Sequence, residues 1–299
     1  MTSTSTSPLL QSTERLQDVL DKQTYQFLDL APKEAMEVLV DKIKELSKTE
    51  IVSKSVQVGD KISSFNMKST DGRLLKSTAL LKNGPIVVTF FRGDWCAYCN
   101  HALRALQQAH PLMKEKGATL IAISPQVTGF QTQDMIEHKY DFPIVCDPGN
   151  ELAKHFKVAF TLHPQVQHVY RDVFGFDLES WNGGGGNPYT LPLPATFVID
   201  VDGTVVYKFV DCNPGRRADP TDILNSIPLP LQRRSWIAGG RRSQRDSRRS
   251  GPATTTTSSS SSSPTTSNKS VRSSGGNGSG SRYSFSKFRN LFMGRRSSK

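Results

Sequence analysis

Hydrophobic and polar positions follow a helical period at the start of this chain. Between about residues 13 and 47, apolar side chains recur every three or four residues, which is typical of amphipathic helices. The first predicted helix covers about 13–30, and the second begins at Pro32, a residue that suits the first turn of a helix. These helices carry no evident chemistry, so we expect them to pack on the rest of the protein or to mediate self-association.

Further along the chain, short apolar runs bounded by turn residues replace this helical period. The expected strands are 86–91, 118–123, 142–146, 194–200 and 204–209. One helix is expected directly after the first of these strands, and others near 133–139, 151–156 and 220–227. Asp71–Gly72 and Asp202–Gly203 are dipeptides typical of β-hairpin turns. Strands that alternate with helices and end in a hairpin predict an α/β fold, a central mixed sheet with helices on both faces.

One long stretch, residues 160–190, shows neither period. It contains four consecutive glycines, Gly183 to Gly186, which no Gly-Lys-Ser/Thr follows, so a phosphate-binding loop is not expected. We predict an irregular connection that includes a flexible glycine loop.

Positive charge is concentrated near the end of the chain. The 299 residues hold 38 Lys and Arg against 27 Asp and Glu, and residues 232–299 contain 15 of these basic residues but one acidic residue. This Ser- and Arg-rich segment has too few apolar residues for a core and is expected to be disordered. Phe285, Phe288, Leu291 and Phe292 recur among its last basic residues, a spacing typical of a helix on an anionic membrane or nucleic acid. A solvated tail is the simpler interpretation.

These patterns divide the chain into four parts. They are a disordered N-terminus at 1–12, a helical extension at 13–55, an α/β domain at 56–231 and the disordered basic tail at 232–299. The first residues lack the basic and apolar regions of a secretory signal, and no apolar run approaches the roughly 18 residues that span a bilayer. We therefore expect a cytoplasmic location, where disulfides are usually transient and catalytic.

The candidate chemistry lies in a Cys-x-x-Cys pair, Cys96 and Cys99, directly after the predicted strand 86–91. Helical spacing resumes at once, so a buried strand delivers both cysteines to the first turn of a helix. The unpaired N–H groups and the helix dipole there favour a negative sulfur, and such a position lowers the pKa of a cysteine to about 3.5–7.5. A pair in this setting predicts thioredoxin-like redox chemistry.

The remaining cysteines and the histidines add no second site. Cys146 lies in an apolar strand and is expected to be a buried, inert thiol, while Cys212 is a weaker candidate for a second resolving thiol. His101, His110 and His155 lack the paired ligand spacing of a zinc site. We expect no metal and no bound cofactor.

Five separated segments carry a family resemblance: Val-Gly-Asp-Lys at 58–61, Phe-Arg-Gly-Asp-Trp-Cys-Ala-Tyr-Cys at 91–99, Ile-Ser-Pro-Gln at 123–126, Phe-Pro-Ile-Val-Cys-Asp at 142–147 and Leu-Pro-Ala-Thr-Phe-Val-Ile-Asp at 193–200. In this order they resemble the peroxiredoxin-like proteins of the alkyl hydroperoxide reductase/thiol-specific antioxidant (AhpC/TSA) family, within the thioredoxin superfamily. The resemblance covers about residues 14–230 and implies a thioredoxin-like fold and a thiol-dependent antioxidant activity.

The resemblance also assigns positions near the pair. Against the Pro-x-x-x-Thr-x-x-Cys motif of typical peroxiredoxins, Cys99 takes the peroxide-reacting position, Cys96 that of the Thr and Arg92 that of the Pro, while the distant arginine of that family falls on Pro194. The segment around Pro194 also resembles the one with a cis-proline in thioredoxin folds, where the backbone of Leu193 pairs with an extended substrate. The residues expected to shape access to the pair are Arg92, Trp95, Tyr98, Pro194 and Thr196.

Two enzymatic interpretations of the pair remain open. In the leading one, a thiolate attacks hydrogen peroxide or an organic hydroperoxide, and the resulting sulfenic acid condenses with the second cysteine. In the alternative, Cys96, as the more exposed sulfur, attacks a protein disulfide and Cys99 resolves the mixed disulfide. A third interpretation is a redox sensor or tether that acts through the basic tail. The resemblance implies a thiol donor such as thioredoxin or glutathione. The other expected partners are a peroxide substrate and a second copy of the chain, as a homodimer.

Overall fold

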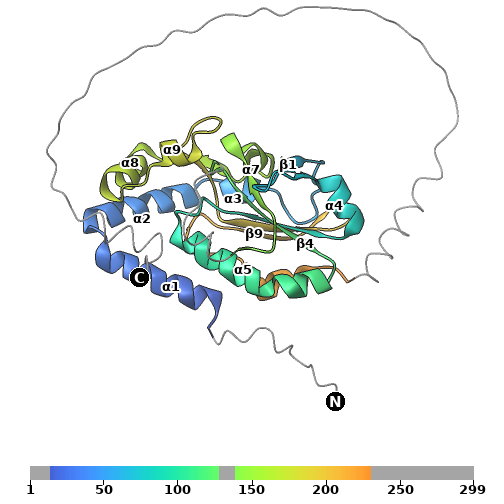
Figure 1. Cartoon of the computed structure of the whole chain (residues 1–299). Helices are drawn as coiled ribbons and strands as arrows, with labels where there is room; N and C mark the ends of the chain where they lie inside the picture. The colour runs from blue at the N-terminus through green and yellow to red at the C-terminus, as the bar shows by residue number, and fades with distance from the viewer. Residues whose placement is uncertain (1–13, 128–138, 230–299) are drawn as a thin grey trace, which may run out of the picture.

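A five-stranded mixed sheet forms the centre of the protein (Figure 1). In this computed structural model, which describes residues 14–127 and 139–229, the strand order is β5-β4-β3-β8-β9. Three parallel strands are followed by an antiparallel pair: β3 (Ile86–Phe90), β4 (Thr119–Ser124) and β5 (Ile144–Cys146), then β8 (Ala195–Ile199) and β9 (Val205–Val210). The predicted α/β sheet and its final hairpin are confirmed.

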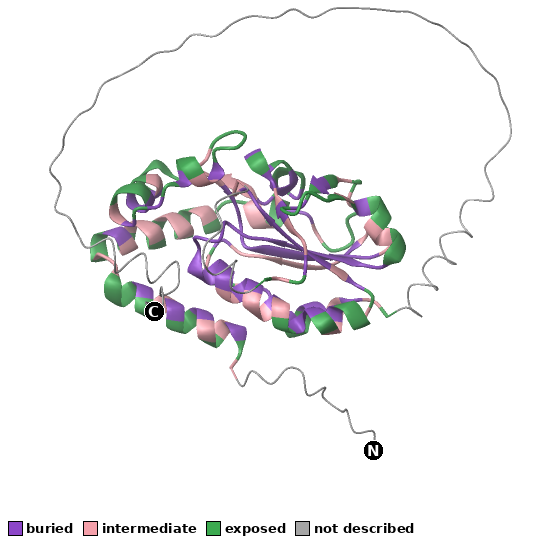
Figure 2. Ribbon diagram, in the orientation of Figure 1, coloured by how far each residue is buried: buried purple, intermediate pink, exposed green. Residues whose placement is uncertain are grey.

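Alternate residues of the central strands pack on opposite faces of the sheet, because successive side chains of a strand point to the two faces in turn. On one face, Val87 and Val198 pack in a core with helices α1 (Leu16–Leu30), α5 (Ala97–Glu115) and α10 (Pro220–Ser226). On the other face, Val88 and Phe197 pack in a core with α3 (Ile51–Lys54), α4 (Ser77–Asn83) and α7 (Glu151–His155). Figure 2 shows the strands buried between these two layers.

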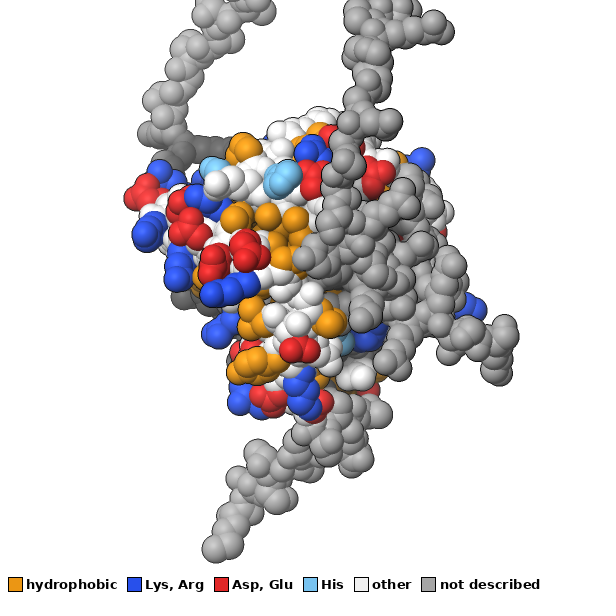
Figure 3. Space-filling view, turned by 90° about the vertical axis from the view of Figure 1, so that its left-hand side faces the viewer, with side chains coloured by type: hydrophobic (Ala, Val, Ile, Leu, Met, Phe, Trp, Pro, Cys, Tyr) orange, Lys and Arg blue, Asp and Glu red, His pale blue; other side chains and the backbone are white. Residues whose placement is uncertain are grey.

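The two N-terminal helices pack on the α/β body. Helix α1 lies along α5 and buries Leu16, Leu20 and Phe27, while α2 (Lys33–Ser47) contacts α8 (Pro164–His168) (Figure 1). Their outer faces expose Tyr25, Leu28, Leu30 and Val40, and Figure 3 shows hydrophobic side chains among charged ones on this side of the molecule. Self-association through these helices stays a prediction.

The prediction of an irregular connection over 160–190 is wrong. After β6 (Ala159–Thr161) the chain forms a series of short elements: α8, the π-helical turn η3 (Val169–Val173), α9 (Leu178–Asn182) and β7 (Thr190–Pro192), which pairs with β6. Each element is at most five residues long, too short to show a period in the sequence. Buried aromatic side chains, among them Tyr170 and Phe176, hold these turns against the body.

The remaining described elements agree with the sequence pattern. β1 (Asn66–Lys68) and β2 (Leu74–Lys76) form the antiparallel hairpin predicted at Asp71–Gly72, and the short turn η2 (Pro148–Asn150) leads into α7. The helix predicted near 133–139 and the segments predicted to be disordered lie outside the described residues, at least in their larger part. Within 14–127 and 139–229, none of the helices combines the length and the apolar character needed to cross a bilayer.

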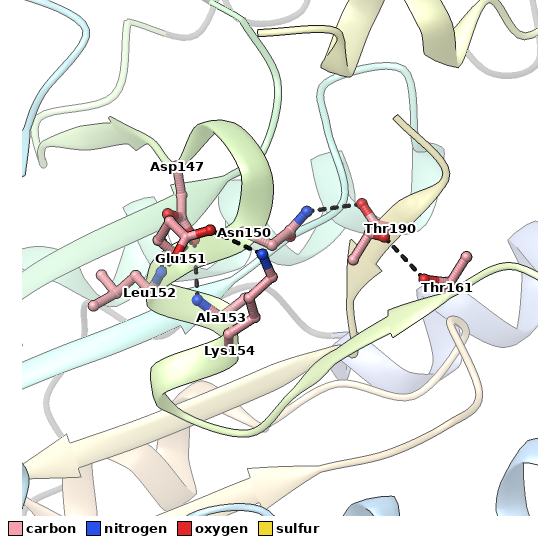
Figure 4. A network of polar contacts seen from close by, with 8 residues as sticks. All are labelled: Asp147, Asn150, Glu151, Leu152, Ala153, Lys154, Thr161 and Thr190. Carbon is pink, nitrogen blue, oxygen red and sulfur yellow. Dashed lines mark hydrogen bonds and ion pairs between the residues drawn. The ribbon is translucent and has the colours of Figure 1, made fainter. Parts of the chain in front are cut away.

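A polar network fixes the turn after β5 (Figure 4). The Asp147 carboxylate accepts the backbone N–H groups of Leu152 and Ala153, each at 3.0 Å, and thereby stabilises the start of α7. Asn150 Nδ2 donates to the backbone carbonyl of Thr190 on β7 at 2.8 Å. The turn is therefore tied to both α7 and the β6–β7 pair.

The glycine loop packs closely on this turn. Gly149 has a φ of +77°, and a Cβ atom there would lie 2.0 Å from the carbonyl oxygen of Gly185. At 3.4 Å, a Cβ on Gly185 would also touch Pro148. The absence of side chains therefore allows two backbone segments to approach each other.

Substituting Gly149 tests this close approach. Gly149→Ala is expected to lower the free energy of unfolding by about 2 to 3 kcal/mol, because it adds a steric overlap to the strain of a left-handed backbone. Gly72→Ala is the matched control, since Gly72 has a φ of +88° but no atom within 4 Å of an added Cβ. Urea unfolding of both variants measures the difference, and equal losses of stability contradict a role for the contact with Gly185.

Candidate active site

The strand, loop and helix predicted around the cysteine pair are present. β3 ends at Phe90, α5 begins at Ala97, and Cys96 occupies the N-cap position with extended backbone. Its carbonyl accepts the N–H groups of Cys99 and Asn100 at 2.9 and 3.1 Å, so the helix starts at the pair itself. Both sulfurs therefore lie at the positive end of a 19-residue helix, where a negative charge is stabilised.

Both cysteines are buried. Cys96 is 1% exposed and Cys99 is 0% exposed, so the structure shows no accessible sulfur at either position, and the difference in exposure expected between them is negligible. Two distant parts of the chain pack over the start of α5, and only the second has a contact with a sulfur: helix α1, and residues 211–218, which we call the cover segment. They meet above α5, where the Tyr98 hydroxyl lies 3.2 Å from Thr24 Oγ1 on α1.

Helix α1 and the cover segment also contact each other. Gln17 Nε2 on α1 donates to the Gly215 carbonyl at 3.3 Å. A Cβ on Gly215 would lie 3.4 Å from Thr24 Oγ1 and 3.5 Å from the Tyr98 ring. The cover is therefore a layer of close contacts between three elements.

Arg92 lies beside the first sulfur. Its Nη2 donates to Cys96 Sγ at 3.0 Å, and its Nη1 donates to the Tyr170 hydroxyl at 2.9 Å. The guanidinium carbon lies 5.4 Å from the centre of the Trp95 ring, within the range of a cation–π interaction. The side chain is buried, so its charge acts on the sulfur with little screening by water.

A second arginine, Arg217 of the cover segment, lies beside the other sulfur. Its Nη2 donates to Cys99 Sγ at 3.3 Å. Local sequence pattern does not reveal this residue, because it is 118 positions away from Cys99. The only indication is the topology of the sheet: Phe90 pairs with Ala195, and Ala195 with Val210, so the segment after β9 leaves the sheet at the same end of the strands as the cysteine pair.

The pKa values of the two thiols are shifted in opposite directions. Burial opposes the ionisation of Cys99, but the hydrogen bond from Cys96 and the charges of Arg217 and Arg92 outweigh it and hold the pKa of Cys99 well below its usual range. Burial and the hydrogen bond to Cys99 raise the pKa of Cys96 well above its usual range, although Arg92 acts in the opposite direction. The favoured state is a Cys99 thiolate that accepts a hydrogen bond from a neutral Cys96 thiol.

Aromatic side chains form one wall of the site. The Trp95 ring is buried and stacks on Trp181, with ring centres 5.9 Å apart and planes 21° apart. Phe176 and Tyr170 lie against the same ring at 5.2 and 6.1 Å. Gly93 permits this packing, because a Cβ there would lie 2.2 Å from Trp95 Nε1.

Pro194 and Thr196 are buried at the start of β8. The Pro194 carbonyl accepts the N–H of Asp211 at 3.1 Å, which ties it to the cover segment, and the Leu193 N–H donates to the Val158 carbonyl at 2.8 Å. This N–H is therefore already paired and does not offer the free edge expected for an extended substrate. Thr196 Oγ1 lies 3.0 Å from Thr89 Oγ1, and in the described part of the chain no hydrogen bond joins it to either sulfur.

The other two cysteines lie apart from the pair in their contacts. Cys146 is half-buried rather than buried, with its Sγ 2.7 Å from the Gln126 carbonyl oxygen, because it is the last residue of the short edge strand β5. Cys212 is buried in the core on the opposite side of the sheet from α5. Among the described residues, no group of three or more His, Cys, Asp or Glu is arranged to hold a metal ion.

The fold and the paired cysteines define the class of the protein, a thiol oxidoreductase with a thioredoxin-like fold. The sequence model of the AhpC/TSA family matches residues 58–208, and the chain belongs to this family, as the resemblance implied.

Proteins of two kinds are similar to this chain. Thiol-disulfide oxidoreductase ResA of Bacillus cereus is 24% identical over 157 residues, which are 52% of this chain and 70% of that protein, and ResA of Bacillus anthracis is 22% identical over 156 residues, with the same two shares. Peroxidoxin BcpB from Mycobacterium tuberculosis superposes with a TM-score of 0.43 at 19% identity, covering 57% of this chain and 96% of that structure. A thiol:disulfide interchange protein DsbE from Chlorobium tepidum superposes with a TM-score of 0.40 at 18% identity and the same coverage.

Proposed function

We propose that this protein reduces hydroperoxides with a dithiol that cycles between the Cys96 and Cys99 thiols and their disulfide. One observation carries the proposal: two guanidinium groups lie 3.0 and 3.3 Å from sulfurs that are 1% and 0% exposed. Such a site stabilises a thiolate, the reactive form of cysteine, and in the closed arrangement described here it leaves no room at the sulfurs for a protein surface. A small peroxide is the substrate that this closed site favours.

The reaction balances with the groups present and an external thiol. A thiolate of the pair attacks one peroxide oxygen, the O–O bond breaks, and the departing alkoxide or hydroxide takes a proton from water and leaves as alcohol or water. The resulting sulfenic acid is attacked by the second sulfur, which gives a disulfide and a molecule of water. The peroxide is thereby reduced by two electrons and the dithiol oxidised by two.

A thiol donor then returns the pair to the dithiol state. Thioredoxin and glutathione are the donors that fit this chemistry, and each supplies two electrons through thiol–disulfide exchange. We place the activity in the cytoplasm, because the disulfide must be reduced again after every turnover. The homodimer, the four-part division of the chain and a contact of the basic tail with an anionic surface stay predictions.

Reduction of protein disulfides is the second candidate function. The ResA relatives are named thiol-disulfide oxidoreductases, and Cys96 and Cys99 have the spacing that such exchange uses. Against it stand the burial of both sulfurs and the paired N–H of Leu193.

A comparison of two substrates tests the proposal. Reduced full-length protein is mixed with one equivalent of hydrogen peroxide or cumene hydroperoxide, and we expect a loss of two mass units in the peptide that contains Cys96 and Cys99. With dithiothreitol as donor, peroxide consumption should be rapid and insulin reduction slow. Rapid insulin reduction without peroxide turnover at micromolar peroxide contradicts the proposed function and favours the second candidate.

A further inference from the structure

The cover segment brings a cation to the inner sulfur of the pair. It begins at Asp211, whose N–H donates to the Pro194 carbonyl at the start of β8, and it ends just before α10. Between these anchors Arg217 reaches Cys99, with Nη2 3.3 Å from Sγ. The chain after β9 is thus fixed at one end to the sheet and contacts the reacting sulfur in its middle.

The backbone of the same segment holds the guanidinium in place. Nη1 of Arg217 donates to the carbonyl oxygens of Pro214 and Arg216. The turn itself is closed by the Asn213 side chain, whose Oδ1 accepts the Gly215 N–H at 2.8 Å. The cation is therefore oriented before any substrate arrives, as an electrostatic catalyst requires.

Among the described residues, no carboxylate neutralises the charge of Arg217. Within residues 14–127 and 139–229, Arg217 forms no ion pair with Asp or Glu. Its closest ionisable partner is Cys99 Sγ. In contrast, Arg92 divides its two terminal nitrogens between Cys96 and Tyr170. Each sulfur is therefore bonded by a different guanidinium, that of Arg92 at Cys96 and that of Arg217 at Cys99.

We propose that Arg217 is a catalytic residue whose guanidinium holds Cys99 as the thiolate, so that Cys99 attacks the peroxide and Cys96 resolves the sulfenic acid. The order of attack rests on the proposed function, whereas the ionisation of Cys99 does not need a peroxide. The bond that forms first is between Cys99 Sγ and oxygen, and Cys96 supplies its thiol proton when the disulfide closes and water leaves.

The ionisable groups around Cys99 come from four elements. Cys96 lies at the start of the same helix, Arg92 follows β3, Arg217 belongs to the cover segment, and the Tyr170 hydroxyl lies beyond Arg92 on η3. The two arginines favour the thiolate, while the neutral Cys96 thiol stabilises it by donating a hydrogen bond. Loss of Arg217 therefore leaves one cation to offset burial.

Titration of the thiolate in the full chain tests the proposal without peroxide. Absorbance at 240 nm against pH gives the midpoint of ionisation, and limited alkylation with iodoacetamide followed by peptide mass spectrometry shows which sulfur is labelled. In the wild-type protein we expect Cys99 to be labelled first, with a midpoint below the usual value of about 8.5. Arg217→Gln should raise this midpoint by about 1 to 2 pH units and slow peroxide reduction at pH 7 at least tenfold. Arg217→Lys, which keeps the charge, should recover part of both effects.

Arg216→Gln is the matched control, because Arg216 is the exposed neighbour in the same turn. It should leave the midpoint, the labelled sulfur and the peroxide rate unchanged. An unchanged midpoint in Arg217→Gln, or first labelling of Cys96 in the wild-type protein, overturns the proposal even if the variant opens the cover and speeds alkylation. A low Cys99 midpoint without peroxide turnover overturns the proposed function and the order of attack, but leaves Arg217 as the residue that ionises Cys99.

Discussion

Cys99→Ser is expected to reduce peroxide turnover below about one thousandth of the wild-type rate, because a serine hydroxyl cannot replace the thiolate that attacks oxygen. Cys96→Ser should behave differently. It should still consume one equivalent of peroxide, but the product should be a sulfenic acid on Cys99, sixteen mass units heavier, since the resolving sulfur is absent. Rapid-mixing kinetics and intact-protein mass spectrometry measure both outcomes.

Cys146→Ser is the control for these two variants, since Cys146 lies on β5 and contacts the Gln126 backbone rather than the pair. It should keep wild-type kinetics. Full activity in both Cys96→Ser and Cys99→Ser contradicts the whole assignment of the site. If Cys96→Ser abolishes the first reaction with peroxide and Cys99→Ser retains it, the order of attack is reversed.

Replacing Arg92 has the second largest expected effect. Arg92→Met should slow the reaction with peroxide about 100-fold or more, because it removes one of the two cations that favour the Cys99 thiolate, together with the donor 3.0 Å from Cys96 Sγ. The rate of Arg92→Lys should lie between those of the wild type and of Arg92→Met. An ammonium group keeps the charge, but it lacks the planar shape with which the guanidinium bonds both Cys96 and the Tyr170 hydroxyl. Stopped-flow consumption of peroxide at pH 7 measures the rates.

Stability measurements separate this chemical effect from a loss of folding. A methionine of similar length fills the space of the guanidinium beside the Trp95 ring, so urea unfolding of reduced Arg92→Met should show a change of at most about 1.5 kcal/mol. A peroxide rate equal to that of the wild type shows that Arg92 only packs. A slow variant that is also largely unfolded leaves Arg92→Lys to decide, because its charge and length are retained.

The parts of the site that are close in sequence could be predicted from the sequence. The apolar run of β3, the cysteine spacing and the return of helical period place Cys96 and Cys99 at the start of α5 without any knowledge of the rest of the fold. Arg92 could be found for the same reason, since it precedes Cys96 by four residues along the loop that β3 and α5 confine.

The parts that depend on distant packing could not be predicted. Arg217 reaches Cys99 only because β9 runs antiparallel to β8 and returns the chain to the end of the sheet where the pair lies. Helix α1 packs on α5 beside the pair, at Tyr98, and its amphipathic pattern indicates a packed helix but not the partner that it covers. The short helical turns between β6 and β7 fold around shared aromatic contacts, and no single turn is long enough to reveal them.

The layer above the sulfurs has a kinetic consequence. A protein donor reduces a disulfide only when its own thiolate aligns with one of the two sulfurs, and α1 and residues 211–218 occupy the space where it must approach. Reduction by a protein donor therefore includes a step in which this layer opens, and steps of this kind take microseconds to milliseconds or longer. With a protein donor, the rate of recycling should then level off at the opening frequency as the donor concentration rises, so the motion of this layer, rather than sulfur chemistry, would set the maximum rate of sustained turnover.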